Sequence, residues 1–260
     1  MDLNLRGRTA LVTGATEGVG RATAKRLAAE GCNLVLVART TANLDRVRDE
    51  IVSETGIHAS IESIDLATQE GREALPPRHP DVDIVICNTG AAEIGTIIDI
   101  DEARWREGWE LKFYGYMALV RAYYPRMCTR RSGVILNVMG VSAERPSPGT
   151  LALGMANASL NAMTKAIGGV SADFNVRVLG VNPGPILTER GMSIIRTFAE
   201  KRFGDAERWP ELAQAMPFSR FARPEEIASI IAFLVSDQAS YMTGTVVNVD
   251  GGISTRVAGY

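Results

Sequence analysis

Residues 13–20 read Thr-Gly-Ala-Thr-Glu-Gly-Val-Gly, and the rest of the chain is organised around this stretch. It follows an apolar run of the β type and opens a helical pattern over residues 21–30. Gly14 can make a tight turn, Gly18 lets the backbone approach a phosphate, and Gly20 lets the helix pack closely on the strand. Backbone N–H groups and the positive end of the helix dipole then face the anion. The stretch therefore predicts a strand–turn–helix unit that binds a nucleotide pyrophosphate.

The rest of the chain alternates strand-like and helical patterns. Continuous apolar runs such as residues 33–37 and 84–87 are typical of strands that are buried on both faces of a parallel sheet. Similar patterns predict strands at residues 60–64, 134–138, 176–181 and 245–249, and helices at residues 42–54, 101–127, 151–170 and 225–235. We expect a loop at Pro76 and Pro77, and interruptions of the helical pattern of residues 188–216 at Gly204, Asp205 and Pro210. The sequence predicts an α/β fold: a single doubly wound Rossmann-type domain over residues 1–260, with a seven-stranded parallel sheet flanked by helices.

Composition and charge argue against several functional classes. The formal net charge of −2 and the isoelectric point near 5.8 provide no general attraction for nucleic acid or an anionic membrane. The three cysteines, Cys32, Cys87 and Cys128, show no metal-ligand spacing and suit free thiols in a reducing compartment. The N-terminus lacks the apolar core of a signal peptide, and no apolar run approaches the ~20 residues that span a bilayer. We expect a cytoplasmic protein with no metal site, no nucleic-acid partner and no membrane contact.

Further motifs accompany the glycine turn. Residues 87–90 read Cys-Asn-Thr-Gly, residues 182–184 read Asn-Pro-Gly, and residues 223–228 read Arg-Pro-Glu-Glu-Ile-Ala. Residues 243–252 begin with Thr-Gly and end in Val-Asp-Gly-Gly. Together with the turn, these motifs resemble those of the ordinary short-chain dehydrogenase/reductase (SDR) family, and the resemblance covers essentially the whole chain.

The resemblance implies a nicotinamide dinucleotide cofactor. It assigns cofactor contacts to Gly14, Thr16, Glu17, Gly18, Val19, Gly20, Arg39, Asp65, Leu66, Asn88, Gly90, Pro183, Gly184, Ile186 and Thr188. At the end of the second predicted strand the chain carries Arg39 and no carboxylate, which favours NADP(H) over NAD(H) because arginine pairs with a 2′-phosphate. The alternative is that Arg39 is a solvated surface charge. Glu17 is mildly contrary to the NADP(H) prediction, because many NADP-using relatives carry a basic residue near that position.

The catalytic half departs from the family. The resemblance implies a serine, a tyrosine, a lysine and an asparagine in the roles of substrate contact, proton donor, pKa modulator and water ligand. Alignment without a gap places Gly140, Leu153, Asn157 and Lys112 at these four positions, in that order. A positioned general acid is worth 10² to 10⁴ in rate, or about 3 to 5.5 kcal/mol. Leucine can donate no proton. Ordinary ketone reduction by the family mechanism should therefore be crippled.

Three interpretations from different classes follow. The protein can be an oxidoreductase acting on a small molecule that needs no tyrosine acid, such as an iminium or a conjugated system. It can be a cofactor-binding pseudoenzyme that senses NADP(H) or supports a partner. It can also host a non-redox reaction, such as an aldol or cyclisation step. Some redox role is the first expectation, although the fold alone does not decide the reaction.

An exchange of residue types at Lys112 and Asn157 can compensate for the loss of the family's lysine. The family's asparagine and lysine positions look exchanged between two helices, so an amine can occupy the same space from the opposite wall. Tyr116 lies four residues after Lys112 and therefore on the same helix face. The simpler interpretations are that Lys112 reaches solvent along its methylene stem and that Tyr116, with other tyrosines, packs in a subunit interface. Ser142, two residues past the lost serine position, can hydrogen-bond a substrate, or it can simply cap a turn.

Residues 188–216 resemble the family's variable substrate lid. Apolar residues there predict a greasy cover, and three arginines can contact an anionic group: Arg190, Arg196 and Arg202. Relatives assemble through the helices after the fourth and fifth strands. The small residues Gly154, Ala158 and Ala162 on the second of these allow close packing, and we expect a homo-oligomer, either a dimer or a tetramer.

Overall fold

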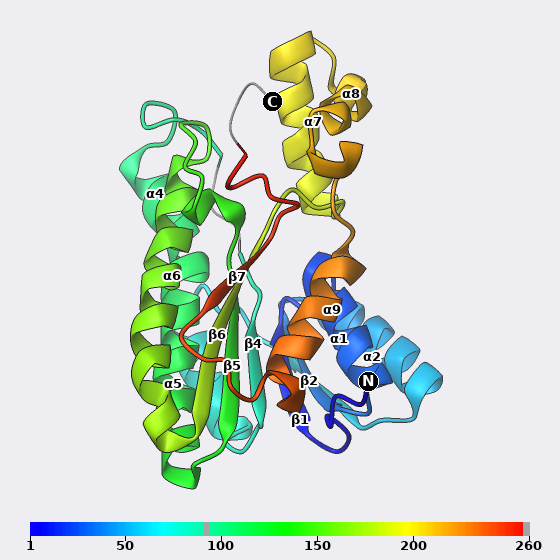
Figure 1. Cartoon of the computed structure of the whole chain (residues 1–260), viewed down its shortest axis with the longest axis vertical. Helices are drawn as coiled ribbons and strands as arrows, with labels where there is room; N and C mark the ends of the chain where they lie inside the picture. The colour runs from blue at the N-terminus through cyan, green and yellow to red at the C-terminus, as the bar shows by residue number, and fades with distance from the viewer. Residues whose placement is uncertain (91–93, 257–260) are drawn as a thin grey trace.

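The computed structural model describes residues 1–90 and 94–256, and Figure 1 shows a parallel sheet between two layers of helices. The sheet has seven strands in the order β3-β2-β1-β4-β5-β6-β7, and every neighbouring pair is parallel. The strands are β1 (Thr9–Thr13), β2 (Asn33–Ala38), β3 (Ala59–Ser63), β4 (Ile84–Cys87), β5 (Gly133–Val138), β6 (Val176–Pro183) and β7 (Val246–Val249). The predicted doubly wound α/β fold is confirmed. The strand order reverses between β1 and β4, where open α/β sheets bind their ligands.

The helices follow the predicted periodicity closely. They are α1 (Gly18–Ala29), α2 (Thr41–Thr55), α3 (Gln69–Arg78), α4 (Glu102–Trp109), α5 (Gly115–Arg130), α6 (Leu151–Ser171), α7 (Glu189–Phe203), α8 (Trp209–Gln214) and α9 (Pro224–Val235). A five-residue π-helix, η1 (Glu110–Tyr114), joins α4 to α5. Short 3-10 turns lie at η2 (Val141–Ala143), η3 (Ala172–Phe174), η4 (Ala206–Arg208), η5 (Pro217–Ser219) and η6 (Asp237–Ala239).

The two faces of the sheet bury separate apolar clusters. Ala10 and Val12 point to the side that α1, α2 and α9 cover, whereas Leu11 between them points to the side of α5 and α6. Successive residues of a strand alternate between faces, so one continuous apolar strand supplies both cores. Helices α7 and α8 project above the carboxyl ends of the strands (Figure 1).

Two proline predictions were wrong. Pro76 and Pro77 lie in the last turns of α3 rather than in a loop, and the carbonyl of Pro76 accepts a hydrogen bond of 2.6 Å from Arg126 Nη1. Pro210 does not interrupt a helix but stands in the first turn of α8, where its missing N–H costs no intrahelical bond.

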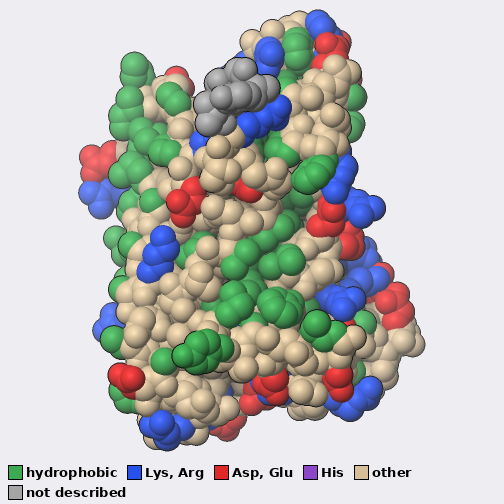
Figure 2. Space-filling view, in the orientation of Figure 1, with side chains coloured by type: hydrophobic (Ala, Val, Ile, Leu, Met, Phe, Trp, Pro, Cys, Tyr) green, Lys and Arg blue, Asp and Glu red, His purple; other side chains and the backbone are tan. Residues whose placement is uncertain are grey.

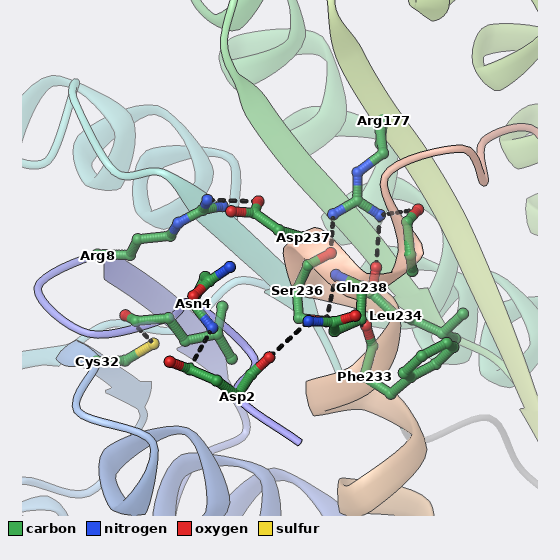
Figure 3. Close-up of polar contacts among 12 residues, drawn as sticks. Asp2, Asn4, Arg8, Cys32, Arg177, Phe233, Leu234, Ser236, Asp237 and Gln238 are labelled. Carbon is green, nitrogen blue, oxygen red and sulfur yellow. Dashed lines mark hydrogen bonds and ion pairs between the residues drawn. The ribbon is translucent and has the colours of Figure 1, made fainter.

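The amino end of β6 is fastened to the chain's own N-terminal and C-terminal regions, as Figure 3 shows. Arg177 donates hydrogen bonds to the carbonyls of Leu234 at 2.5 Å and Ser236 at 2.9 Å, at the end of α9. Arg8 forms an ion pair of 2.5 Å with Asp237. A cation at a helix C-terminus satisfies its last carbonyls and its dipole. These contacts lie at the edge of the sheet opposite the carboxyl ends, which are thereby left for the site.

The face in Figure 2 carries apolar side chains across its middle, over β7 and α9, and Lys and Arg side chains around α7 and α8. No helix within residues 1–90 and 94–256 is long and apolar enough to cross a membrane. The small-residue face of α6 is only partly as expected, because Ala158 and Ala162 are exposed but Gly154 is buried against the carbonyl of Ser142. The predicted homo-oligomer stays a prediction.

Candidate active site

A cleft of about 1310 Å³ lies over the carboxyl ends of β1, β2, β4, β5 and β6 and under α7. It lies at the reversal of strand order between β1 and β4. Ordinary small-molecule pockets measure roughly 300–1,000 Å³. The cleft is therefore large enough for a dinucleotide and a second molecule side by side.

The glycine turn forms one wall of this cleft. Gly14 and Gly18 adopt φ values of +64° and +50°, a region that side chains disfavour, and α1 begins at Gly18. A Cβ on Gly18 would lie 3.0 Å from the Thr188 methyl group, and one on Gly20 would lie 2.1 Å from the carbonyl oxygen of Gly14. Gly20 does not line the cleft, and its lack of a side chain allows α1 to pack closely on the turn. This cradle of exposed backbone at a helix N-terminus fits a pyrophosphate.

The predicted cofactor residues come together at one surface. All of them except Gly20 line the cleft: Gly14, Thr16, Glu17, Gly18, Val19, Arg39, Asp65, Leu66, Asn88, Gly90, Pro183, Gly184, Ile186 and Thr188. Asn88 is locked to β1, since its backbone N–H donates to Thr13 Oγ1 at 2.8 Å. Thr188 caps α7 by accepting a hydrogen bond of 2.9 Å from the Gly191 N–H.

Arg39 stands at the end of β2, beside Thr40 and Asn43 of the same cleft wall. It is exposed and has neither an ion pair nor a side-chain hydrogen bond to any part of the chain that the structure describes. An unpaired guanidinium at this wall fits an anionic group such as a ribose phosphate. The acidic Glu17, which is the N-cap residue of α1, lines the same wall.

The four residues that the alignment predicts at the family's catalytic positions also meet at the cleft: Gly140, Leu153, Asn157 and Lys112 all line it, together with Ser142. Asn157 is 1% exposed, and its Nδ2 donates a hydrogen bond of 2.9 Å to Ser142 Oγ. Its Oδ1 has no hydrogen-bond partner among the described residues. A serine hydroxyl can donate or accept, so either orientation of the amide leaves one Asn157 atom available to a ligand.

Lys112 is held inside by the π-helix. The η1 turn hydrogen-bonds the N–H of Gly115 to the carbonyl of Glu110, and Arg72 Nη1 donates to the same carbonyl at 3.1 Å. Single π turns occur often at functional sites. Lys112 is only 4% exposed, and its Nζ donates to the Val138 carbonyl at 3.0 Å and to Tyr116 Oη at 3.3 Å. The interpretation of Lys112 as a solvated side chain is therefore wrong.

Burial lowers the pKa of Lys112 from 10.5 to about 7, the positive charge of Arg190 adds to this shift, and Cys87 opposes it. Removal from water disfavours the ammonium, and Lys112 has no carboxylate partner among the described residues. Near neutral pH a large share of Lys112 is therefore a neutral amine. The cleft offers an uncharged nucleophile or a proton carrier that can donate and accept at pH 7.

The expectation that Tyr116 packs in a subunit interface was wrong. Tyr116 and Tyr123 are fully buried in the protomer, because the face of α5 that carries them packs against the sheet. Tyr116 Oη donates to the Val138 carbonyl at 2.7 Å, so Tyr116 and Lys112 share one acceptor at the end of β5. Burial raises the pKa of the Tyr116 phenol well above its ordinary value, which keeps it protonated.

The substrate lid stays a prediction, and its three arginines lie in different places. Arg190 and Arg202 line the cleft, but Arg196 does not, and its Nε lies 3.4 Å from Glu207. Sequence reasoning missed three more cations along the wall, Arg145, Lys201 and Arg256. Arg145 Nη1 donates to the Ile253 carbonyl at 2.6 Å, and Arg256 Nη1 donates to the Ala215 carbonyl at 2.8 Å. The C-terminal segment thus joins the α6 side of the cleft to the lid, a contact between distant segments that no local pattern indicates.

The fold and the cleft together define a Rossmann-type nucleotide-binding protein, and the chain belongs to the short-chain dehydrogenase/reductase family. A family model described as Enoyl-(Acyl carrier protein) reductase matches residues 14–254. Human dehydrogenase/reductase SDR family member 4 is 30% identical, over 97% of this chain and 90% of its own length. YmfI of Bacillus subtilis, described as an uncharacterized oxidoreductase, is 34% identical over 94% of this chain and 98% of its own.

Solved structures of reductases have the same fold. L-sorbose reductase from Gluconobacter frateurii, in complex with NADPH and L-sorbose, matches with a TM-score of 0.89 at 30% identity, over 99% of this chain and all of its own. YwfH, an NADPH-dependent reductase involved in bacilysin biosynthesis, matches with a TM-score of 0.88 at 26% identity, over 96% of this chain and all of its own. These similarities support an SDR oxidoreductase.

Proposed function

We propose that this protein is an NADP(H)-dependent oxidoreductase that reduces a small molecule without a tyrosine acid. One observation carries the proposal: a complete nucleotide cradle continues, within one cleft, into a wall where Leu153 replaces the acid and Lys112 supplies a buried amine. A protein that had lost catalysis altogether would have no reason to keep a buried, carboxylate-free lysine at that wall, since its desolvation costs several kcal/mol.

The chain's own residues would bind and orient the nucleotide. The N-terminus of α1 and the backbone of Gly14 and Gly18 face the pyrophosphate. The guanidinium of Arg39 would pair with a 2′-phosphate, and Pro183 and Gly184 would bound the nicotinamide end. When bound, the reduced nicotinamide would supply a hydride to the substrate. Two solved relatives described as using NADPH support this cofactor.

The residues at the catalytic end of the cleft limit which substrates the protein would reduce. Reduction of a simple ketone creates an alkoxide that needs a proton at oxygen, and Leu153 can neither donate a proton nor form a hydrogen bond. Hydride addition to an iminium gives a neutral amine, whereas hydride addition to a conjugated acceptor gives a delocalised anion that takes its proton at carbon from water. Asn157 and Ser142 can hold that water, and Lys112 can stabilise negative charge in its protonated form.

Two other functions compete with this proposal. A cofactor-binding pseudoenzyme would bind NADPH and turn over nothing, and it would be indifferent to Lys112→Met. A non-redox enzyme would use the amine of Lys112 without consuming the nucleotide. Oxidation of NADPH in the presence of a conjugated substrate separates the proposed reductase from both.

The cofactor is tested by calorimetry with NADPH and NADH on the wild type and on Arg39→Asp. We expect the wild type to prefer NADPH by tenfold or more, roughly 1.4 kcal/mol, and Arg39→Asp to invert the preference because a carboxylate repels the 2′-phosphate. Arg46→Asp on α2 is the matched control, since Arg46 is also exposed but does not line the cleft. NADH bound as tightly as NADPH by the wild type would refute the preference. Binding of neither nucleotide would refute the reductase.

A further inference from the structure

Lys112 is the one buried lysine among the four of the chain. The other three, Lys25, Lys165 and Lys201, are exposed or partly exposed, and Lys25 pairs with Glu50 at 2.6 Å. Lys112 Nζ instead contacts a carbonyl oxygen and a phenol, both of them uncharged. An ammonium in such surroundings is poorly compensated, whereas a neutral amine keeps its nucleophilic lone pair.

Lys112 lies beside Gly90 at the wall of the cleft. A Cβ on Gly90 would lie 2.9 Å from Lys112 Cδ and 3.1 Å from Nζ, so the absence of a side chain there lets the lysine side chain pack against the Gly90 backbone. Gly90, Leu153 and Lys112 line the same cleft. A carbonyl carbon that enters this end meets a nitrogen nucleophile and an apolar side chain, with no phenol to protonate its oxygen.

We propose that Lys112 forms a Schiff base with an α,β-unsaturated aldehyde or ketone, which makes the protein a conjugate reductase that works through an iminium ion. This inference rests on the proposed NADP(H)-dependent function and names its substrate class. Lys112 Nζ forms a bond to the carbonyl carbon, and the carbonyl oxygen leaves as water after gaining the two amine protons, while one proton from solvent remains as the charge of the iminium.

The remaining steps balance without an acid on the protein. Transfer of hydrogen with two electrons from the reduced nicotinamide to the β-carbon turns the iminium into a neutral enamine on Lys112. Water protonates the α-carbon, and hydrolysis of the saturated iminium releases the saturated carbonyl product and the free amine. The carbinolamine oxygen takes its protons from the amine, and the hydride transfer itself produces no alkoxide, which accounts for Leu153 at the tyrosine position.

Other contacts suit these steps. The iminium keeps one N–H, which can still donate to the Val138 carbonyl, 3.0 Å from Nζ in the free enzyme. Ser142 Oγ, which accepts a hydrogen bond of 2.9 Å from Asn157 Nδ2, lines the same cleft and can bind the water that leaves and returns. Reduction at the carbonyl carbon itself would leave a stable secondary amine on Lys112, so only a conjugated substrate gives turnover.

The test is reductive trapping with cinnamaldehyde and sodium borohydride, without nucleotide, followed by peptide mass spectrometry. We expect the adduct on Lys112 in at least tenfold excess over Lys165 and Lys201. Lys112→Arg should lose the adduct, while the matched change Lys165→Arg on α6 should retain it. Label spread over the exposed lysines with no excess at Lys112 in the wild type would overturn the proposal, and this result does not depend on whether a variant folds.

A second measurement separates this inference from the proposed function. With NADPH, the product should be the saturated aldehyde, and cinnamyl alcohol as the main product would overturn the Schiff base while leaving an NADPH-dependent reductase. Trapping at Lys112 in a protein that binds no NADPH would support the Schiff base and refute the reductase.

Discussion

The two halves of the cleft differ in what fixes them. The cofactor half is fixed by backbone: Gly14 and Gly18 adopt φ values of +64° and +50°, and a Cβ on Gly20 would lie 2.1 Å from the carbonyl oxygen of Gly14. The catalytic half is fixed by side chains, and at Gly140 the nearest atom to an added Cβ is the movable end of Asn157, at 2.9 Å. Nucleotide binding thus depends on the path of the chain, whereas the reaction depends on a few side chains that can be exchanged without disturbing the sheet.

The sharpest way to break this comparison is to rebuild the family's catalytic residues. Leu153→Tyr alone should add little ketone reduction, because an unassisted phenol has a pKa near ~10. Gly140→Ser, Leu153→Tyr, Asn157→Lys and Lys112→Asn together should raise ketone reduction by roughly 10²-fold or more, since groups that act as a unit are not additive. The measurement is kcat/KM for NADPH oxidation with a simple ketone.

The control for this experiment is the affinity for NADPH, which should stay within a few-fold of the wild type in every variant. A wild type that already reduces simple ketones well would show that Leu153 does not stand where an acid is needed. Equal gains from the single and the combined changes would show that the four positions do not act together.

The contrast between backbone and side chains also explains what the sequence could predict. Continuous apolar runs identify buried parallel strands, and glycines at φ-positive turns identify the cradle, because both depend on local geometry. The π-helix around Lys112 could not be predicted, since its Glu110 carbonyl accepts a hydrogen bond from Arg72, nearly forty residues away, in addition to the one from the Gly115 N–H. Arg256 beside the lid is another case, because its place depends on how the C-terminal segment crosses the completed fold.

Tyr116 is another residue whose environment the sequence could not predict. Periodicity placed it correctly on the face of Lys112, but periodicity does not say whether that face meets the sheet or a second subunit. The sheet decides this by placing the Val138 carbonyl within reach of both side chains.

The second prediction concerns how the buried Lys112 changes the free energy of unfolding with pH. Between pH 7 and about 10.5 the unfolded chain holds a proton on Lys112 that the folded protein has released, so the wild type gains stability as pH rises. Lys112→Met removes this dependence. The stability advantage of Lys112→Met over the wild type should therefore shrink by about 2 to 3 kcal/mol from pH 7 to pH 9. Urea unfolding at both pH values measures it.

The groups that face Lys112 do not confuse this measurement. Burial raises the pKa of Cys87 to about 12 and the pKa of Tyr116 well above its usual value, so neither group titrates between pH 7 and pH 9. Lys165→Met, at an exposed position of α6, is the control and should show no such change with pH. An unchanged difference at Lys112 would mean that its amine stays protonated in the fold, which would count against the Schiff base as well.

The smallest expected effect is also the most direct test of backbone against side chain. Gly20→Ala would place a Cβ 2.1 Å from the Gly14 carbonyl oxygen and 2.5 Å from Asn88 Nδ2, so the turn itself must move. We expect a loss of about 1–3 kcal/mol in the free energy of unfolding and weaker NADPH binding, even though alanine favours the helix. Gly140→Ala, in extended backbone, meets only the end of the Asn157 side chain and should cost less than ~1 kcal/mol with unchanged NADPH affinity. Urea unfolding and calorimetry on the two variants would show the difference, and equal losses would mean that side chains and backbone constrain the two halves alike.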